Sequence, residues 1–538
     1  MKNTTAMADY ELRHIEALRK DLAGCTVLLK KDGSFPLEKP CTLAAYGSGV
    51  RRTIRGGTGS GEVNSRYIVT IEEGLQQAGF TLTGMEWHTG YEQAREKAHK
   101  AFLKQLKKDA KAAKQNFILY GMGKVMPEPE YDLPLNAEGD AAIYVVSRIS
   151  GEGNDRTPLK GDIRLTDSEV RDILALDKKF TRFMLVLNVG GVVDLSPVMS
   201  VRNILLLSQL GVETGGAPAD ILPGKANPSG KLTTTWAAFE EYPEMPDFED
   251  MNETRYREGI YVGYRYFETF GDAAKRVCYP FGFGLSYTQF SLTVQSVTET
   301  AQAIRAFVLV TNTGDYSGKE VVQMYYSAPQ GLLQKPAREL SAFCKTRTLL
   351  PGESQLLTLE TAKNSMASYD DLGKIFKSSY ILEKGDYHFY IGTSVRDVTA
   401  LDYVMTLDAN LLVEQLSSKA APASLKKRLL ADGSYEELPQ GTANNPNACV
   451  FEKMIPGTEE ALSPATRGRA SCLLLNSYKE NAHPLIDVYE GKISLDEFTA
   501  QLDDDDLILL LGGQPNTSVA NTYGYGNLPE YGVPNIMT

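Results

Sequence analysis

The chain has 538 residues, of which 42% are hydrophobic and 23% are charged. This length exceeds what one hydrophobic core can organise, so we expect two or three domains of the soluble globular type. The net charge of −12 argues against a surface that attracts phosphate backbones, so we expect no nucleic acid partner.

The N-terminus, MKNTTAMADYELRHIEALRKDLAG, contains no apolar core of the signal-peptide type. No run of about 18 apolar residues, the length that spans a bilayer, occurs in the sequence. The six cysteines form no CxxC pair, which is typical of reduced thiols, and the five histidines show no metal-ligand spacing. We therefore expect a cytoplasmic protein with no membrane partner and no metal.

Short apolar runs alternate with helical patterns from about residue 24 to 235. The runs expected to be strands are TLAAYG (42–47), NFILYGM (116–122), AAIYVVSR (141–148), FMLVLNVG (183–190) and NILLLSQ (203–209). Amphipathic segments, including 71–80 and 167–180, lie between them. This alternation predicts an α/β domain with a largely parallel sheet covered on both faces. In such sheets ligands bind outside the carboxyl ends of the strands, where this sequence places glycines, as in YGSG and NVGG.

A basic helical stretch extends from Tyr91 to Gln115. We interpret it as a solvated amphipathic face. Two glycine-rich segments have structural interpretations as well. RGGTGSGEVN (55–64) lacks the GK[ST] of a Walker A loop and is expected to form a tight turn, whereas LGVETGG (210–216) is expected to begin a helix.

One loop combines glycines with ionisable side chains. In AAIYVVSRISGEGNDR a strand leads into a loop where Glu152 lies between two glycines and is followed by Asp155 and Arg156. Flanking glycines allow close approach of a ligand, and a glutamate there is a candidate general acid. From these residues alone, an ordinary solvent-exposed loop glutamate is the stronger interpretation.

From about residue 288 to 400 the spacing of hydrophobic residues changes to an alternation of apolar and polar positions. Short alternating runs such as SLTVQSVTET, IRAFVLVTNTG and EVVQMYYSAP are separated by turn residues. This pattern predicts an all-β sandwich, and sandwiches of this kind more often brace other domains than carry out chemistry.

Residues 406–490 are rich in Ala, Ser, Asn and Pro and are expected to be a linker that holds a helix or two. A helix start follows in KISLDEFTAQL, where Ser494 and Glu497 fit a capping box. The final VPNIMT resembles a strand barely begun. One helix and half a strand leave their apolar faces without a partner, so we expect the sequence to be a truncated record.

The segment SRISGEGNDR resembles the acid/base loop of glycoside hydrolase family 3 β-glucosidases. Segments similar to the α/β sandwich domain of that family occur in the same order, including RGGTGSGEVNSRY (55–67), VLNVGGVVDLS (186–196) and ILPGKANPSGKLTTTW (221–236). VTNTGDYSGKEVVQMYYSAP and KPARELSAFCKTRTLLPGES resemble its fibronectin type III-like domain. Because many motifs share one order, this resemblance is specific.

The resemblance implies a reversed domain order, with the catalytic barrel last. ISLDEFTAQL and YGNLPEYGVPNIMT are similar to the opening of that barrel. The resemblance therefore divides the chain into a helical lead-in (1–23), the α/β sandwich domain (24–287), the fibronectin type III-like domain (288–405), the linker (406–490) and an incomplete barrel start (491–538).

By resemblance, Glu152 is the general acid/base, and Asp155 and Arg156 shape the loop or lie near the substrate. The SDW-type segment that carries the nucleophilic aspartate in the family is missing from these residues. The implied function is retaining hydrolysis of a β-glucoside or related β-glycoside without a cofactor, by a chain that is inactive without its barrel. Two alternatives stay open: a non-catalytic carbohydrate-binding or scaffold protein, and one half of a two-chain enzyme.

Overall fold

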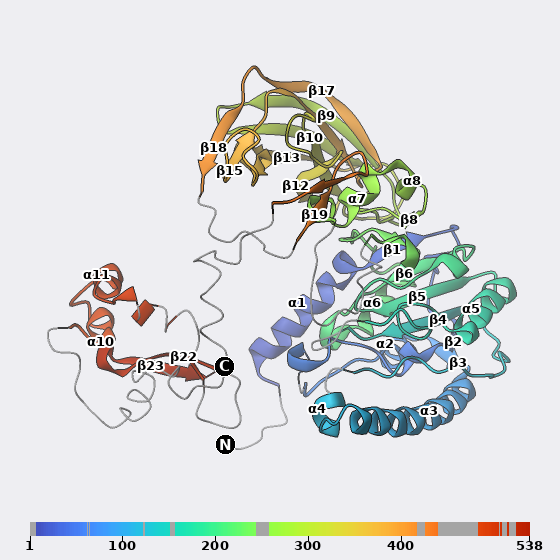
Figure 1. Cartoon of the computed structure of the whole chain (residues 1–538). Coiled ribbons are helices and arrows are strands. Elements are labelled where there is room, and N and C mark those ends of the chain that lie inside the picture. The colour runs from blue at the N-terminus through green and yellow to red at the C-terminus, as the bar shows by residue number, and fades with distance from the viewer. Residues whose placement is uncertain are drawn as a thin grey trace. The chain divides into compact units, whose positions relative to one another are not determined.

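The computed structural model describes residues 7–61, 63, 65–121, 124–150, 156–243, 258–416, 425–439, 482–504, 506–507, 510, 514–515 and 523–537. The chain forms two compact units, which are described separately (Figure 1). The first comprises Met1–Ser418 with Pro422–Gln440, and the second Lys419–Ala421 with Gly441–Thr538.

A six-stranded sheet with the order β1-β6-β5-β4-β2-β3 forms the centre of the N-terminal domain (Figure 1). Every neighbouring pair is parallel except β1 and β6 at one edge. The strands are β1 (Val27–Lys30), β2 (Thr42–Tyr46), β3 (Thr81–Thr83), β4 (Ala141–Arg148), β5 (Phe183–Val189) and β6 (Ile204–Leu206). The predicted α/β domain with a largely parallel sheet is confirmed.

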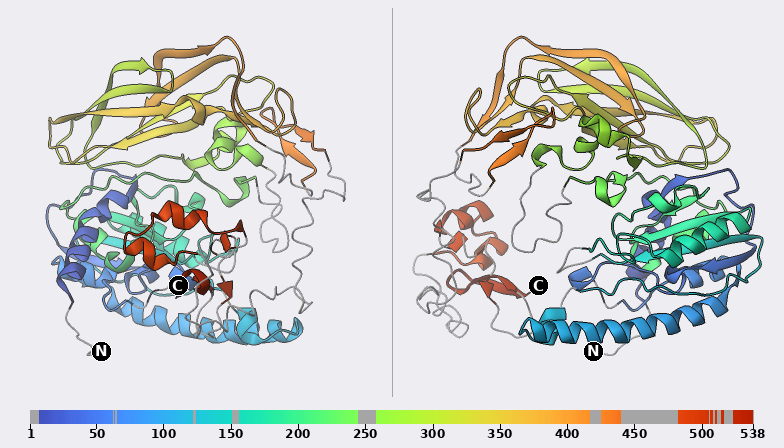
Figure 2. Two further views of the ribbon diagram at one scale, coloured as in Figure 1. Left: turned by 90° about the vertical axis from the view of Figure 1, so that its left-hand side faces the viewer. Right: turned by 45° about the vertical axis from the view of Figure 1, so that its right-hand side comes forward.

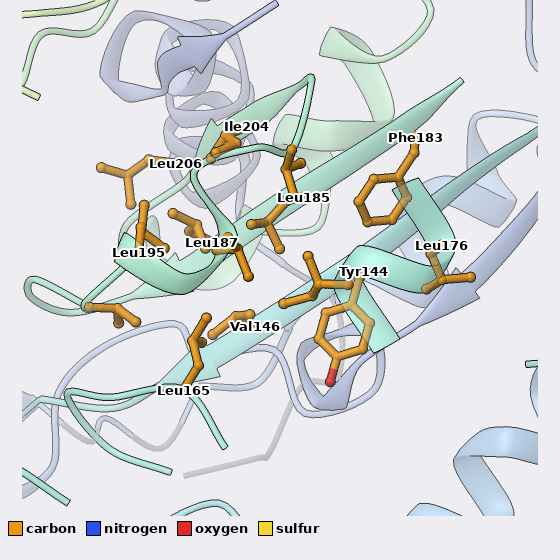
Figure 3. Close-up of a cluster of buried hydrophobic side chains, with 14 of the residues drawn as sticks. Tyr144, Val146, Leu165, Leu176, Phe183, Leu185, Leu187, Leu195, Ile204 and Leu206 are labelled. Carbon is orange, nitrogen blue, oxygen red and sulfur yellow. The ribbon is translucent and has the colours of Figure 1, made fainter. Parts of the chain in front are cut away.

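Helices cover both faces of this sheet, because its central strands are apolar on both sides. Tyr144 and Val146 of β4 point into one core (Figure 3), whereas Ile143 and Val145 point into the other. The first core is closed by α3 (Met85–Ala112) and α5 (Asp167–Lys179), and the second by α1 (Asp9–Cys25), α2 (Ile71–Gln77) and α6 (Gly216–Ile221). The long helix α3 extends along one side of the sheet (Figure 2). α2 and α5 are the two amphipathic segments predicted to be helical, and each begins with a capping box.

One predicted strand is a helix. Within NFILYGM, residues Phe117–Gly121 form α4. The amide of Ile118 donates to the Asn116 side chain (2.8 Å), as at a helix start, and Ile118 itself is 72% exposed. The assignment was wrong because periodicity cannot distinguish a strand from a helix in so short an apolar run.

The second domain of this unit is an all-β sandwich, as predicted. Its sheets have the orders β13-β10-β9, β12-β11-β16-β17 and β14-β15-β18. Val308, Met324 and Phe389 from facing strands meet in its core. The strands are β9 (Phe290–Glu299), β10 (Ala303–Asn312), β11 (Val321–Ser327), β12 (Glu339–Lys345), β13 (Ser354–Ala362), β14 (Ser368–Asp370), β15 (Ser379–Leu382), β16 (Gly385–Gly392), β17 (Val398–Leu407) and β18 (Leu411–Gln415).

The sandwich is joined to the α/β domain by hydrogen bonds as well as by the chain. Lys345 Nζ donates to the carbonyl of Gly24 (2.7 Å), and Gln323 Nε2 donates to the carbonyl of Gly282 (3.0 Å). The connecting region contains β7 (Trp236–Ala237), α7 (Tyr264–Thr269), α8 (Gly271–Ala274) and β8 (Val277–Tyr279).

The region expected to be a linker contains strands. β18 pairs with β15, and β19 (Lys427–Leu429) pairs with β20 (Tyr435–Glu437). The helix expected in this Ala- and Ser-rich stretch is therefore wrong for residues 425–439. The hairpin turns at residues 431–433, where the Gly433 amide donates to the Leu430 carbonyl (3.0 Å) and Gly433 has φ +84°; a three-residue loop with a left-handed glycine is a common hairpin connection. Residues 440–481 lie outside the described part of the chain.

The second unit has a small core of its own. Phe498, Leu528 and Tyr531 are buried together, so the expectation that this segment leaves its apolar faces without a partner is wrong. The capping box is confirmed, because Ser494 Oγ accepts from the Glu497 amide (3.1 Å) and the Ser494 amide donates to the Glu497 carboxylate (2.8 Å). The elements are α10 (Leu485–Tyr489), α11 (Leu495–Ala500), β21 (Gln514–Pro515), β22 (Tyr523–Leu528) and β23 (Val533–Met537).

Candidate functional site

The topology of the sheet marks one crevice for a ligand. From β2 the chain first adds β3 on one side and then β4 on the other, so the strand order reverses between β2 and β4. Doubly wound sheets bind ligands outside the carboxyl ends of the strands at such a point. A cavity of about 890 Å³ lies there, lined by residues 51–54 after β2 and residues 147–150 at the end of β4. The same end of β4 leads into the loop singled out in the sequence.

Two of the three predicted site residues, Glu152 and Asp155, lie outside the described residues, as does the whole of 151–155. The third, Arg156, is described and lines the cavity together with Ser150. The structure therefore defines the two ends of the loop that carries the candidate proton donor.

Arg156 holds the exit of the loop. Its Nε donates to Oδ1 of Asp162 (2.8 Å), and its Nη1 donates to the carbonyl of Val192 (2.7 Å). Burial lowers the pKa of the guanidinium, and the neighbouring Asp162 carboxylate counteracts that effect. Arg156 is thus tied both to its own loop and to the segment after β5.

Asp162 is the acceptor at the centre of this arrangement. Its Oδ2 accepts from the amide of Thr157 (2.6 Å) and from the Thr157 hydroxyl (3.0 Å). Its backbone carbonyl accepts from Nε of Arg148 (2.9 Å). Asp162 therefore connects the residue that ends β4 with the first residues after the loop. The sequence alone gives Asp162 no role, because a lone aspartate six positions after Arg156 fits no motif.

A buried ion pair fixes the entrance of the loop. Arg148 Nη2 lies 2.6 Å from Oε2 of Glu169, and both side chains are 3% exposed. The same oxygen accepts from the amide of Thr166 (2.8 Å) and so caps α5. The last residue of β4 and the first turn of α5 therefore share one carboxylate.

Two glycines after β5 lie against both ends of the loop. A Cβ atom on Gly190 would lie 2.6 Å from Ser150 Oγ and 2.6 Å from Nε2 of Gln209, and one on Gly191 would lie 3.2 Å from Nη1 of Arg156. A Cβ on Gly190 would therefore require the Gln209 amide and the Ser150 hydroxyl to move. These are the glycines of NVGG, which the sequence placed at a strand end.

The opposite wall of the cavity comes from residues 124–128. The amide of Glu128 donates to the carbonyl of Gly161 (2.8 Å), and the hydroxyl of Tyr91 donates to the Glu128 carboxylate. Burial raises the pKa of Glu128, although Arg148 favours its charged form. Glu128 carried no motif in the sequence, since only the fold brings residues 124–128 beside 161.

Arg148 and Glu169 at the entrance of the loop, and Arg156 and Asp162 at its exit, are together called the frame. These side chains do not form a complete catalytic pair. Asp162 is engaged by Arg156 and Thr157, and Glu128 is held by Tyr91. In the part of the chain that the structure describes, no three His, Cys, Asp or Glu side chains gather in a metal-binding group. The same part contains no helix that is both long and apolar enough to cross a bilayer. The described side chains thus lie at both ends of the loop that was singled out in the sequence.

Comparison with known families gives two matches. Residues 26–287 match the glycosyl hydrolase family 3 C-terminal domain, and residues 320–395 match the fibronectin type III-like domain. The C-terminal-domain-first order predicted from the sequence fits these matches.

Among curated proteins, β-glucosidase A of Butyrivibrio fibrisolvens is 41% identical over 98% of this chain and 68% of its own length. A β-glucosidase of Ruminococcus albus is 33% identical over 94% of this chain and 52% of its own length. The chain thus spans roughly half to two-thirds of these relatives.

Two solved structures share the fold. A β-glucosidase from Paenibacillus barengoltzii superimposes with a TM-score of 0.75 at 34% identity, covering 97% of this chain and 57% of the other. β-Glucosidase 3B from Thermotoga neapolitana, solved in complex with glucose, gives a TM-score of 0.62 at 33% identity, covering 76% and 55%.

Proposed function

Because this chain belongs to glycoside hydrolase family 3, we propose that Glu152 donates the proton that releases the leaving group from a β-glucoside or a related β-glycoside. The named relatives are β-glucosidases, and the resemblance of SRISGEGNDR to the family's acid/base loop assigns the role to Glu152 alone.

Retaining hydrolysis requires two carboxyl groups about 5–5.5 Å apart across the scissile bond. Glu152 first protonates the departing oxygen, while a carboxylate attacks the anomeric carbon to form a glycosyl-enzyme. Glu152 then accepts a proton from water, which attacks the same carbon and releases the sugar.

We assign the second carboxylate to a barrel that lies outside these 538 residues. The family carries its nucleophile in an SDW-type segment, and the sequence contains no such segment. The 538-residue chain alone is therefore expected to turn over β-glucosides poorly or not at all.

The observation that carries the proposal is the frame around residues 151–155. The frame lies at the switch point of the sheet, where ligands bind, and Arg156 and Asp162 hold its exit. We propose that Arg156 is a positioning residue that fixes the loop, and that Asp155 acts with it. Effective proton transfer needs a donor within hydrogen-bond distance of the leaving oxygen. Side chains that fix both ends of the loop would help to keep the Glu152 carboxyl group at that distance.

The test compares the 538-residue chain with a chimera. The chimera joins this chain to the part of the Butyrivibrio fibrisolvens relative that the alignment leaves unmatched. Both are assayed on cellobiose and on an aryl β-glucoside with an activated leaving group. Turnover by the chimera alone supports the proposal, whereas equal turnover by both would overturn the assignment of the nucleophile to the barrel.

In the chimera, Glu152→Gln removes the proton donor. General acid catalysis contributes about 10²–10⁴-fold, so cellobiose hydrolysis is expected to fall by that factor, while the activated aryl glucoside loses far less in its glycosylation step. Glu138→Gln, at a side chain that is 87% exposed, is the matched control. Equal losses on both substrates would remove Glu152 from its role. Glycan binding by a chimera without turnover would favour the carbohydrate-binding alternative.

A further inference from the structure

Among the described residues, the cavity at the switch point is lined by more cationic than anionic side chains. The described lining contains six cationic side chains, Arg51, Arg52, Arg95, Lys124, Arg148 and Arg156. It contains two acidic side chains, Glu128 and Asp162. This local excess runs against the net charge of −12 of the whole chain, so it does not follow from composition.

Four of the six cations have acidic partners. Arg148 and Arg156 pair with Glu169 and Asp162, as described above. Arg51 lies 2.8 Å from Glu72, and Arg52 lies 3.7 Å from Glu92. These contacts account for four positive charges and leave Arg95 and Lys124.

Arg95 and Lys124 have no acidic side chain within ion-pair distance among the described residues. Arg95 projects from α3, and the buried atom Nε of its guanidinium has no hydrogen-bond partner in the described structure. Lys124 Nζ lies 4.7 Å from the centroid of the Tyr120 ring. The Glu128 carboxylate also lines the cavity, but it accepts from the Tyr91 hydroxyl and no ion pair joins it to Arg95 or Lys124 among the described residues.

Two further buried donors face the same space. Nη2 of Arg156 and Oγ of Ser150 have no hydrogen-bond partner within the described residues, and both residues line the cavity. Buried polar atoms in folded proteins are nearly always hydrogen-bonded. Donors open toward one cavity suit a ligand that carries several acceptor oxygen atoms.

The remaining wall is apolar. Phe102, Met126 and Pro127 line the cavity, as do Val125 and Leu159, which are 49% and 56% exposed. A simple inorganic anion would leave these side chains in water. A ligand that combines a flat apolar body with a carboxylate would cover them and reach the guanidinium groups, whose planar fork matches a carboxylate.

We propose that this cavity binds an aryl carboxylate, with Arg95 and Lys124 recognising the carboxylate and the side chains around Phe102 covering the ring. At about 890 Å³ the cavity falls in the range of small-molecule sites. The ligand is either the free aromatic acid or a β-glucoside whose aglycone is that acid. Binding of the free acid goes beyond the hydrolytic function, whereas binding of the acid as an aglycone rests on the proposed function; calorimetry measures either without turnover.

The experiment is calorimetry on the 538-residue chain. The ligands are 4-hydroxybenzoate, the neutral 4-hydroxybenzyl alcohol, inorganic phosphate, 4-carboxyphenyl β-glucoside and phenyl β-glucoside. The two carboxylates are expected to bind about tenfold more tightly than their neutral analogues, since one charge-assisted hydrogen bond is worth that ratio or more. Tighter binding of the carboxylated glucoside than of the free acid assigns the ligand as an aglycone, and equal or weaker binding assigns it as a free acid.

Two substitutions test the residues. Arg95→Gln and Lys124→Gln should each weaken 4-hydroxybenzoate about tenfold, whereas Lys104→Gln, which removes the same charge from an exposed position on α3, should leave it unchanged. Lys124 is exposed, so Lys124→Gln is expected to fold and still tests the proposal if Arg95→Gln does not fold. No binding, equal binding of acid and alcohol, phosphate bound as tightly as the acid, or an equal loss from Lys104→Gln would each overturn the proposal.

Discussion

Replacing Asp162 with Asn should weaken the contacts that fix Arg156 and Thr157 at the end of the loop, while the size of the side chain at position 162 stays nearly the same. The aspartate accepts one hydrogen bond from the Arg156 guanidinium and two from Thr157. An amide at this position keeps a single acceptor oxygen and turns an NH₂ group toward one of these donors. The substitution therefore removes a negative charge and places the new NH₂ group opposite an N–H or O–H donor of Arg156 or Thr157.

The expected cost is about 2 kcal/mol. Removing one partner of a fully buried pair costs about 3–5 kcal/mol, and exposed pairs are worth about 0–1 kcal/mol. The side chains of Arg156 and Asp162 are 16% and 19% exposed, so this pair lies between those limits. The hydrogen bonds to Thr157 are local and are partly replaced by water in the variant.

The assay uses the two tryptophans of the chain, Trp87 and Trp236, which both lie in one core of the α/β domain. Their fluorescence during urea unfolding therefore reports this domain and not the sandwich. Trypsin cleavage after Arg156 gives a second readout, because a released guanidinium becomes a substrate. Asp132→Asn is the control, since Asp132 is 99% exposed in its contact with Arg171.

The reasoning is refuted if Asp162→Asn unfolds within about 0.5 kcal/mol of the parent chain, the range of ordinary surface substitutions. It is also refuted if Asp132→Asn lowers stability equally, or if trypsin cleaves after Arg156 at an unchanged rate.

Three further outcomes are expected. Burial lowers the pKa of His88 to about 4, below its unfolded value near 6.5, so the unfolded chain binds the proton first. Stability should therefore fall by up to about 3 kcal/mol as pH drops from about 6.5 to 4, and His88→Gln should flatten that part of the Trp-monitored profile; an unchanged slope would contradict the linkage. Glu169→Gln should cost about 3–5 kcal/mol by the same urea assay, because it leaves the Arg148 charge buried without its partner, and a loss below about 1 kcal/mol would contradict this. Gly74→Ala should destabilise the domain by about 1–3 kcal/mol, because its Cβ would meet the backbone oxygen of Gly215 at 2.1 Å. Gly271→Ala, where an added Cβ meets nothing within 4 Å, should be neutral in the same measurement; equal effects would count against a steric cause.

The sequence predicted those parts of the fold that local pattern determines. The runs that became β4 and β5 are mostly apolar and are buried along their whole length, because both faces of the sheet are covered. Within NFILYGM the local pattern is the same, but Phe117–Gly121 form a helix, since their position beside α3 is decided by tertiary packing. The hairpin β19–β20 was missed although Asp432–Gly433 carries a turn signal, because the surrounding composition resembles a linker.

The site shows the same division. The loop and Arg156 were identified from the motif, because glycines and charges there are consecutive. Asp162, Glu128 and Arg95 were not assigned a role, since they reach the cavity from a later turn, an extended segment and a helix. No spacing rule connects these positions, and only the fold brings them together. Glu152 lies outside the described residues, so its role as general acid/base stays a proposal.

One oxygen atom of Glu169 serves two elements at once. It caps α5 through the amide of Thr166 and receives the guanidinium of Arg148 at the end of β4. A protein engineer who transfers residues 148–156 to another scaffold would therefore have to bring the first turn of α5 with them, because Arg148 would otherwise lose its partner.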